Sequence, residues 1–158
     1  MNGTAGHRGS EVLNRQEFVR FAYSNALFEM ETARLALERS RDEKQRRFAQ
    51  EMLDAHGQSA EELRGLLRNQ ADLRSIQPPE KMADQHQPWL GQPRTAQGEN
   101  FQTLYAQQQA QAHLIALDLC RNYAQAADDE TLKRWAAARL PVLQAHLREA
   151  QALKGGSP

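Results

Sequence analysis

Apolar side chains recur at mixed intervals of three and four residues over four long stretches of this chain, and this periodicity constrains the fold more than any other feature. The stretches span residues 14–40, 43–70 and 99–127, and the last one ends near 153. Such spacing places the apolar side chains on one face of a helix. Val, Ile and Thr are few while Ala, Gln and Leu are abundant, which also favours helix over strand. The pattern therefore predicts four amphipathic helices.

The segments between these helices indicate how they are arranged. Asp42 stands at the first turn, and Asp128 and Asp129 stand at the last one, where a short polar side chain caps the helix that follows. Helices joined by such short turns run antiparallel. The middle segment, 71–98, is different because prolines and glycines interrupt it, and it is long enough to run back along the full height of a bundle.

These features predict an all-α fold, and within that class an antiparallel four-helix bundle of the ferritin-like kind with a long connection between helices two and three. We expect the bundle to occupy residues 14–153, between a disordered N-terminal segment at 1–13 and a disordered tail at 154–158. Trp89 and Leu90 are expected to pin the long connection onto the bundle.

Composition and motifs exclude several classes of function. Lys plus Arg balance Asp plus Glu at 20 each, which argues against a nucleic-acid partner, and no stretch reaches the ~20 apolar residues of a membrane span. The single cysteine, Cys120, is expected to be a core residue. No phosphate-binding loop or Ser/His/Asp set identifies a small-molecule substrate, so the prediction leans away from an enzyme. A protein partner or a homodimer remains open.

The N-terminal residues lack the apolar segment of a secretion signal, which predicts a cytoplasmic protein. If a signal peptide had been removed beforehand, the prediction would become periplasmic.

Histidines near the middle of three different predicted helices are the main functional clue. They are His56, His113 and His146, and Glu29 stands at a comparable height on the remaining helix. Glu29 lies about 11 residues before the first turn and His56 about 13 residues after it, a difference of one helical turn or less. His113 and His146 lie about 14 and 17 residues from their shared turn. All four side chains are therefore expected to meet at one level of the bundle.

Three imidazoles and one carboxylate suit a single Zn, Fe, Mn or Cu ion. A di-iron site would need Glu-x-x-His pairs, and no glutamate stands three residues before any of the three histidines, which favours a mononuclear site. Glu149 could join from the same face as His146, and Asn25 and Gln109 are expected to form hydrogen bonds to the ligands.

Three functional hypotheses follow. The first is a metal-binding bundle that acts in metal handling or stress response, with Glu29, His56, His113 and His146 as ligands. The second is a non-enzymatic structural or interaction bundle whose buried histidines form a polar core network. The third is a di-iron oxidase.

Several short segments also resemble a known family. They are Phe18 through Asn25 with Leu27 and Glu29, Phe48 through Met52 with Asp54 and His56, Phe101 and Tyr105 with His113, and Leu132, Leu140, Pro141, His146 and Leu147. In order and spacing they are similar to a bacterial family of ferritin-like domains of unknown function, often labelled predicted outer-membrane or periplasmic proteins. The resemblance spans residues 14–153 and implies a ferritin-like bundle and a bacterial source, but no activity. The chain departs from the family in lacking a secretion signal and in having Gln102 where the family usually has Asp.

Overall fold

The computed structural model describes residues 13–79 and 87–153, and every regular element in these ranges is helical. The long helices are α1 (Arg15–Arg39), α2 (Glu43–Asn69), α4 (Gly98–Gln125) and α5 (Glu130–Ala152). A 3₁₀ turn, η2 (Ala71–Leu73), and a short helix, α3 (Gln87–Thr95), lie between α2 and α4. The predicted all-α class is confirmed. Of the termini predicted to be disordered, only Leu13 lies within the described residues, and it is buried.

Three of the long helices begin at side chains that cap their first turn. Asn14 Oδ1 accepts a hydrogen bond from Glu17 N at 2.8 Å, Asp42 Oδ1 accepts one from Gln45 N at 3.2 Å, and Asp129 Oδ2 accepts one from Leu132 N at 2.9 Å. Each bond gives a partner to a backbone N–H that the helix itself leaves unpaired. The predicted caps at Asp42 and Asp129 are confirmed.

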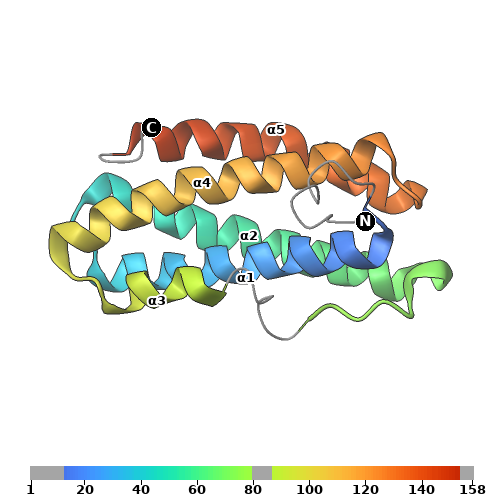
Figure 1. The fold of residues 1–158 in the computed structure, drawn as a ribbon, viewed down its shortest axis with the longest axis horizontal. Coiled ribbons are helices and arrows are strands. Elements are labelled where there is room, and N and C mark those ends of the chain that lie inside the picture. The colour runs from blue at the N-terminus through green and yellow to red at the C-terminus, as the bar shows by residue number, and fades with distance from the viewer. Residues whose placement is uncertain (1–12, 80–86, 154–158) are drawn as a thin grey trace, which may run out of the picture.

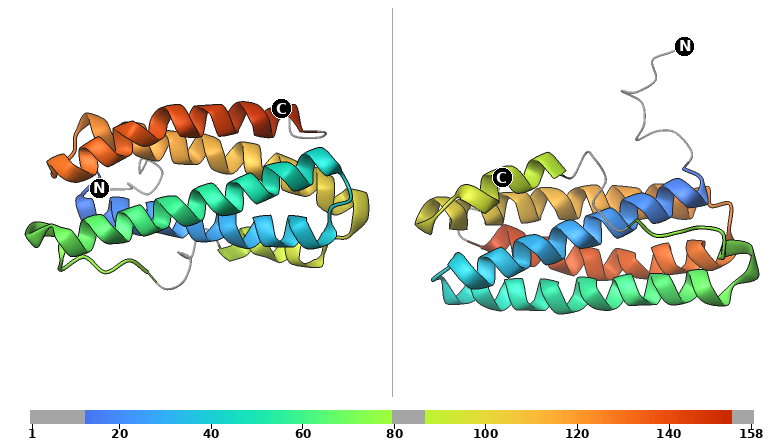
Figure 2. Two further views of the ribbon diagram at one scale, coloured as in Figure 1. Left: turned by 180° about the vertical axis from the view of Figure 1, so that it is seen from behind. Right: turned by 90° about the horizontal axis from the view of Figure 1, so that it is seen from below.

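The four long helices lie side by side, and each runs antiparallel to its neighbours (Figures 1 and 2). Gln45 Nε2, at the start of α2, donates to Gln102 O, at the start of α4, at 2.9 Å, so these two helices run in the same direction. Lys44 Nζ, also at the start of α2, donates to Ala152 O at the end of α5 at 3.2 Å. The helix directions are therefore up, down, down, up, and the connection from α2 to α4 returns along the length of the molecule.

The helix α3 within this connection was not predicted, because its sequence contains Pro93. Proline has no N–H to donate to the carbonyl four residues earlier, which belongs to Trp89. Gln108 Nε2 of α4 donates to that Trp89 carbonyl at 3.1 Å and so replaces the missing bond. A partner from another helix thus allows a helix that local sequence disfavours.

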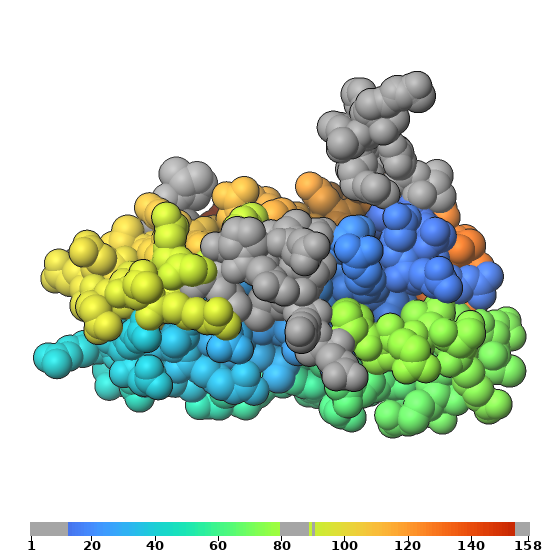
Figure 3. Space-filling model, turned by 60° about the horizontal axis from the view of Figure 1, so that its bottom comes forward, coloured from blue at the N-terminus to red at the C-terminus, as the bar shows by residue number. Residues whose placement is uncertain are grey.

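Contacts of Arg39 and Phe28 fix α3 and the residue that follows it against α1. Arg39 donates to Pro93 O at 2.6 Å and to Ala96 O at 3.2 Å, and the Trp89 ring meets the Phe28 ring edge-on with centroids 5.6 Å apart. In the space-filling view α3 lies over the C-terminal end of α1 (Figure 3). Trp89 therefore pins the connection as predicted, whereas the side chain of Leu90 lies outside the described part.

The core is apolar toward both ends of the helices and polar in the middle. Phe18 stacks on Tyr123 at one end with centroids 4.2 Å apart, and Phe101 stacks on Tyr105 at the other end with centroids 5.9 Å apart. Buried polar residues occupy the level between them, namely Asn25, Glu29, Thr32, His56, Gln109, His113 and His146. Cys120 is buried, as expected. None of the helices in the described ranges is long and apolar enough to cross a membrane.

Candidate metal centre

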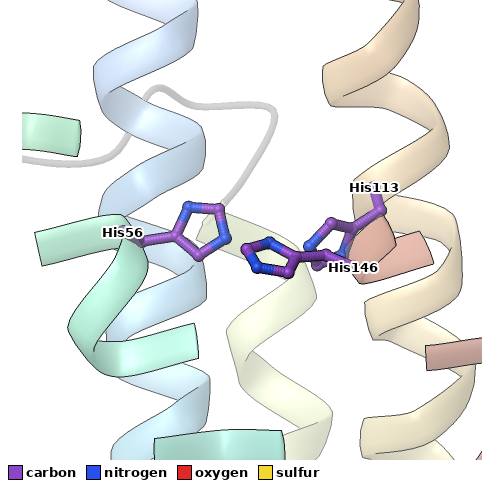
Figure 4. A group of neighbouring side chains, drawn as sticks. All are labelled: His56, His113 and His146. Carbon is purple, nitrogen blue, oxygen red and sulfur yellow. The ribbon is translucent and has the colours of Figure 1, made fainter. Parts of the chain in front are cut away.

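The three predicted histidines converge in the middle of the molecule. His56 comes from α2, His113 from α4 and His146 from α5, and their rings point toward one another (Figure 4). The ring centroids of His113 lie 5.7 Å from those of His56 and His146, and the centroids of His56 and His146 lie 6.1 Å apart. One nitrogen from each ring lies within 4.8 Å of the other two. All three residues are buried, and we call them the inner cluster.

Glu29 lies next to the inner cluster without joining it. The side chain is fully buried, and Glu29 Oε2 lies 3.6 Å from His113 Nδ1. The glutamate thus faces the Nδ1 side of one imidazole and is not within the 4.8 Å that groups the three nitrogens. Counting residues along the helices predicted the level of Glu29 correctly. Its position around the axis of α1, however, directs the carboxyl group toward His113 and not toward the point where the three imidazoles meet.

A backbone carbonyl determines which nitrogen of His113 is available. His113 Nδ1 lies 2.8 Å from Gln109 O, one turn earlier in α4, and a carbonyl can only accept a hydrogen bond. Nδ1 therefore carries the proton, and Nε2 keeps a free lone pair, which is the arrangement common in metal-bound histidines.

The two residues predicted to hydrogen-bond the ligands behave differently. Gln109 is fully buried, and besides its carbonyl contact its Nε2 donates to Thr32 Oγ1 at 3.3 Å. Asn25 is buried too, but its Nδ2 has no partner among the described residues. Asn25 instead lines a small cavity next to the inner cluster.

That cavity has a volume of about 30 Å³, enough for roughly one water molecule. Its lining includes Asn25, His56, Cys120, Trp135 and Arg139. The partly buried guanidinium of Arg139 lies 5.9 Å from the Trp135 ring centroid. A positive charge is therefore held close to the inner cluster.

Burial keeps the inner cluster uncharged at neutral pH. Burial raises the pKa of Glu29 to about 8, and the nearby Gln109 side chain offsets part of this rise. Burial lowers the pKa of His113 to about 4, although its bond to the Gln109 carbonyl acts in the opposite direction. The contact between Glu29 and His113 is thus not an ion pair at pH 7. Burial also lowers the pKa of His56 and of His146, so all three imidazoles are in the neutral form that binds metals.

Several polar atoms of this region have no hydrogen-bond partner among the described residues. They are His56 Nε2, His113 Nε2, His146 Nδ1 and both carboxyl oxygens of Glu29, all of them buried. Leaving a buried polar atom unpaired costs about 1–3 kcal/mol, so such atoms are rare unless they serve a purpose. Lone pairs of this kind are what a cation would require.

Two glutamates lie on the other side of His146. His146 Nε2 is 3.7 Å from Glu51 Oε2, and Glu149 completes a group whose ligand atoms lie within 4.8 Å of one another. The predicted approach of Glu149 therefore occurs at this outer position and not in the inner cluster. Glu51 was missed, although it stands on α2 before His56 and faces α5, because periodicity does not show which charged residues of neighbouring helices meet.

The sequence from residue 3 to residue 153 matches a family model described as a domain of unknown function, DUF4142, and the chain belongs to this family. None of the curated proteins matches it closely enough to count as a relative.

Two solved structures share the fold. One is CopM in the Cu(II)-bound form, with a TM-score of 0.73 and 14% identity over 89% of this chain and 95% of that one. The other is a DUF305 protein from Streptomyces coelicolor that is inferred to be secreted, with a TM-score of 0.66 and 18% identity over 86% of this chain and 88% of that one. At such identities the likeness establishes a shared fold and nothing more.

Proposed function

We propose that this DUF4142 protein is a ferritin-like four-helix bundle that binds one transition-metal ion, copper above all, and acts in metal handling or stress response. The observation that carries the proposal is the inner cluster, in which imidazoles from three helices meet with unpaired nitrogens in a buried setting. Metal binding by the isolated protein tests the proposal.

His56, His113 and His146 would hold the ion through nitrogen, and Glu29 would lose its proton when the cation binds and so supply negative charge beside His113. Nitrogens that share one ion through bonds of about 2.0 Å lie roughly 3.3 Å apart, so the rings need only a small inward movement from their present spacing. The Gln109 carbonyl supports this role because it leaves Nε2 of His113 unprotonated.

Chemistry favours copper among the candidate Zn, Fe, Mn and Cu ions. Nitrogen ligands bind Cu²⁺ more strongly than the other divalent ions of the first transition row. The structural likeness to a protein solved in a Cu(II)-bound form supports testing copper first. The ligand set supports a mononuclear site over a di-iron oxidase centre, because Glu29 is the one buried carboxylate among the described residues.

The alternative function is structural, with the histidines organising a polar core. The hydrogen bond from His113 to Gln109 O lies within α4, and the bond from Gln109 Nε2 to Thr32 links α4 to α1; both favour this alternative because they need no ion. The unpaired nitrogens favour the metal site instead, since a purely structural network would satisfy its own polar atoms.

We place the protein outside the cytoplasm, which corresponds to the periplasmic alternative. The support is the fold shared with a protein inferred to be secreted, together with the labels common in the family that the sequence resembles. Expressing the native gene with its own start and fractionating the cells would test this location.

The decisive experiment loads untagged, metal-free protein with Cu(II), Zn(II), Fe(II) or Mn(II), removes excess ion by desalting, and measures bound metal by elemental analysis. We expect about one tightly held ion per chain for the wild type and a large loss for His113→Gln/His146→Gln. Arg134→Gln, an exposed change on α5, serves as the control and should bind like the wild type. A folded wild type that retains none of the four ions would leave the histidines as a structural network.

A further inference from the structure

We propose that Glu51, Glu149 and His146 form a second, outer metal site at the surface, and that ions reach the inner cluster through it. The ligand atoms of the three residues lie within 4.8 Å of one another, with His146 Nε2 3.7 Å from Glu51 Oε2. Two carboxylates and one imidazole form a donor set that suits Zn²⁺ or Cu²⁺. The transfer step rests on the proposed function, whereas the outer site does not.

The outer site joins the surface to the interior. The Glu51 side chain is 47% exposed, whereas that of His146 is only 7% exposed. Glu51 extends from α2 and Glu149 from α5, so the site bridges two helices. A partly hydrated carboxylate pair can capture an ion that still carries water, and the buried imidazole offers the next ligand.

The two carboxyl groups face each other without a cation. Their ligand oxygens lie within 4.8 Å of each other. Within the described ranges no lysine or arginine forms an ion pair with either residue. Like charges at this distance repel, and a shared metal ion would relieve the repulsion.

His146 belongs to both groups, and this sharing is what suggests transfer. Its Nε2 faces Glu51, while its Nδ1 is buried without a hydrogen-bond partner in the described structure. The other two members of the inner cluster are almost inaccessible, with His113 at 0% and His56 at 3% exposure. An ion held by the outer site would already be bound to the one imidazole of the inner cluster that lies beside the partly exposed Glu51.

The first test is the rate of loading. Metal-free protein is mixed with Zn(II) or Cu(II) in a stopped-flow instrument, for the wild type and for Glu51→Gln/Glu149→Gln. We expect the variant to load the inner cluster about tenfold more slowly or worse, as loss of electrostatic capture predicts, while its equilibrium affinity for the inner ion stays within about threefold. Glu61→Gln/Glu130→Gln removes one exposed carboxylate from each of the same two helices and should load like the wild type.

The second test detects the outer site without the inner one. His113→Gln disables the inner cluster, and this variant should still bind one Cu(II) weakly, with an electron paramagnetic resonance signal that disappears when Glu51→Gln/Glu149→Gln is added.

Equal loading rates in the first test would overturn the transfer route, and no residual Cu(II) in the second would overturn the outer site. If the proposed function itself is wrong, the result differs from both of these: the wild type would then bind only the weakly held ion that depends on Glu51 and Glu149.

Discussion

At the scale of single residues, the polar middle of the core combines the imidazoles of the inner cluster, which are easy to bury, with the carboxyl group of Glu29, which is not. Neutral imidazoles tolerate burial, and the Gln109 carbonyl fixes the proton of His113 on Nδ1. Glu29 is fully buried with both oxygens unpaired, so its ionised form is strongly disfavoured. Burying the Glu29 carboxyl group therefore lowers the stability of the ion-free protein at neutral pH.

Replacing Glu29 with glutamine should stabilise the metal-free protein at neutral pH. The pKa of Glu29 rises from 4.5 to about 8 on folding, so between these pH values the folded state holds a proton that the unfolded chain releases. Wild-type stability thus falls as pH rises from 4.5 toward 8, whereas glutamine cannot ionise. We expect Glu29→Gln to add about 1–3 kcal/mol at pH 7.5 and almost none at pH 4.5.

Urea unfolding of metal-free protein at the two pH values measures this effect. Glu31→Gln, a change on the same helix at a partly exposed residue, is the control and should shift stability by less than about 0.5 kcal/mol at either pH. An equal effect of Glu29→Gln at both pH values would show that folding does not raise the pKa of Glu29.

Arg139 should weaken metal binding, because its guanidinium adds to the effect of burial in lowering the pKa of His56, His113 and His146 and would oppose a cation for the same reason. We expect Arg139→Gln to tighten Zn(II) binding by about threefold to tenfold in calorimetric titrations, on the order of 1 kcal/mol. Arg134→Gln removes a charge of the same sign from an exposed position on α5 and should change affinity by less than about twofold. Weaker binding by Arg139→Gln would mean that the guanidinium orients the ligands.

The sequence predicted at which level along the helices the candidate-site residues lie, but not the direction in which each side chain points from its helix. Counting residues from two turns placed Glu29, His56, His113 and His146 at one level, because the rise per residue of a helix is constant. Which way a side chain points depends on helix packing, which the count does not contain. Glu29 therefore lies beside His113 alone, and Glu149 lies beside Glu51. The roles of these residues as metal ligands remain predictions.

At the scale of elements, helix α3 depends on a neighbour. Pro93 leaves the Trp89 carbonyl without its intrahelical donor, and Gln108 of α4 replaces it. Long helices with capping aspartates were predictable because their signals are local. A helix stabilised by a side chain from another element carries no such local signal.

Removing this donor should loosen α3 while leaving the long helices in place. We expect Gln108→Ala to cost about 1 kcal/mol, because the Trp89 carbonyl loses its hydrogen bond. Amide hydrogen exchange should become faster in residues 89–95 and stay unchanged in the middle of α4. Gln107→Ala changes the neighbouring exposed glutamine and should have neither effect. Unchanged exchange in α3 would show that Trp89 and Arg39 alone hold it.

At the scale of the whole molecule, the sequence predicted the class and the length of the connection but left the helix directions open. A segment long enough to span the molecule permits an up, down, down, up order without requiring it. Contacts that join distant parts of the chain determine the order, such as Gln45 with Gln102 and Lys44 with Ala152. Each of these contacts involves a long polar side chain at a helix end, whose partner the sequence does not show.

This arrangement makes the inner cluster a cross-link between the two halves of the molecule. The short turns join α1 to α2 and α4 to α5, whereas His56 belongs to the first pair and His113 and His146 to the second. An ion bound only by the folded state adds RT ln(1 + [L]/Kd), or about 2.7 kcal/mol at one hundred times Kd. For a chain of this length we expect Tm to rise by about 5–10 °C when the inner cluster is loaded.

Amide hydrogen exchange of Cu(II)-loaded and metal-free protein shows where that stabilisation acts. Loading of the inner cluster should slow exchange in the middle of α2, α4 and α5, because each of these helices contributes one imidazole. An ion confined to the outer site would protect α2 and α5 and leave α4 unchanged, since Glu51, His146 and Glu149 come from those two helices alone. The response of α4 therefore separates the two sites, and His113→Gln, which removes the α4 ligand, should convert the first pattern into the second. Bound copper without protection of α4 in the wild type would contradict an ion at the inner cluster.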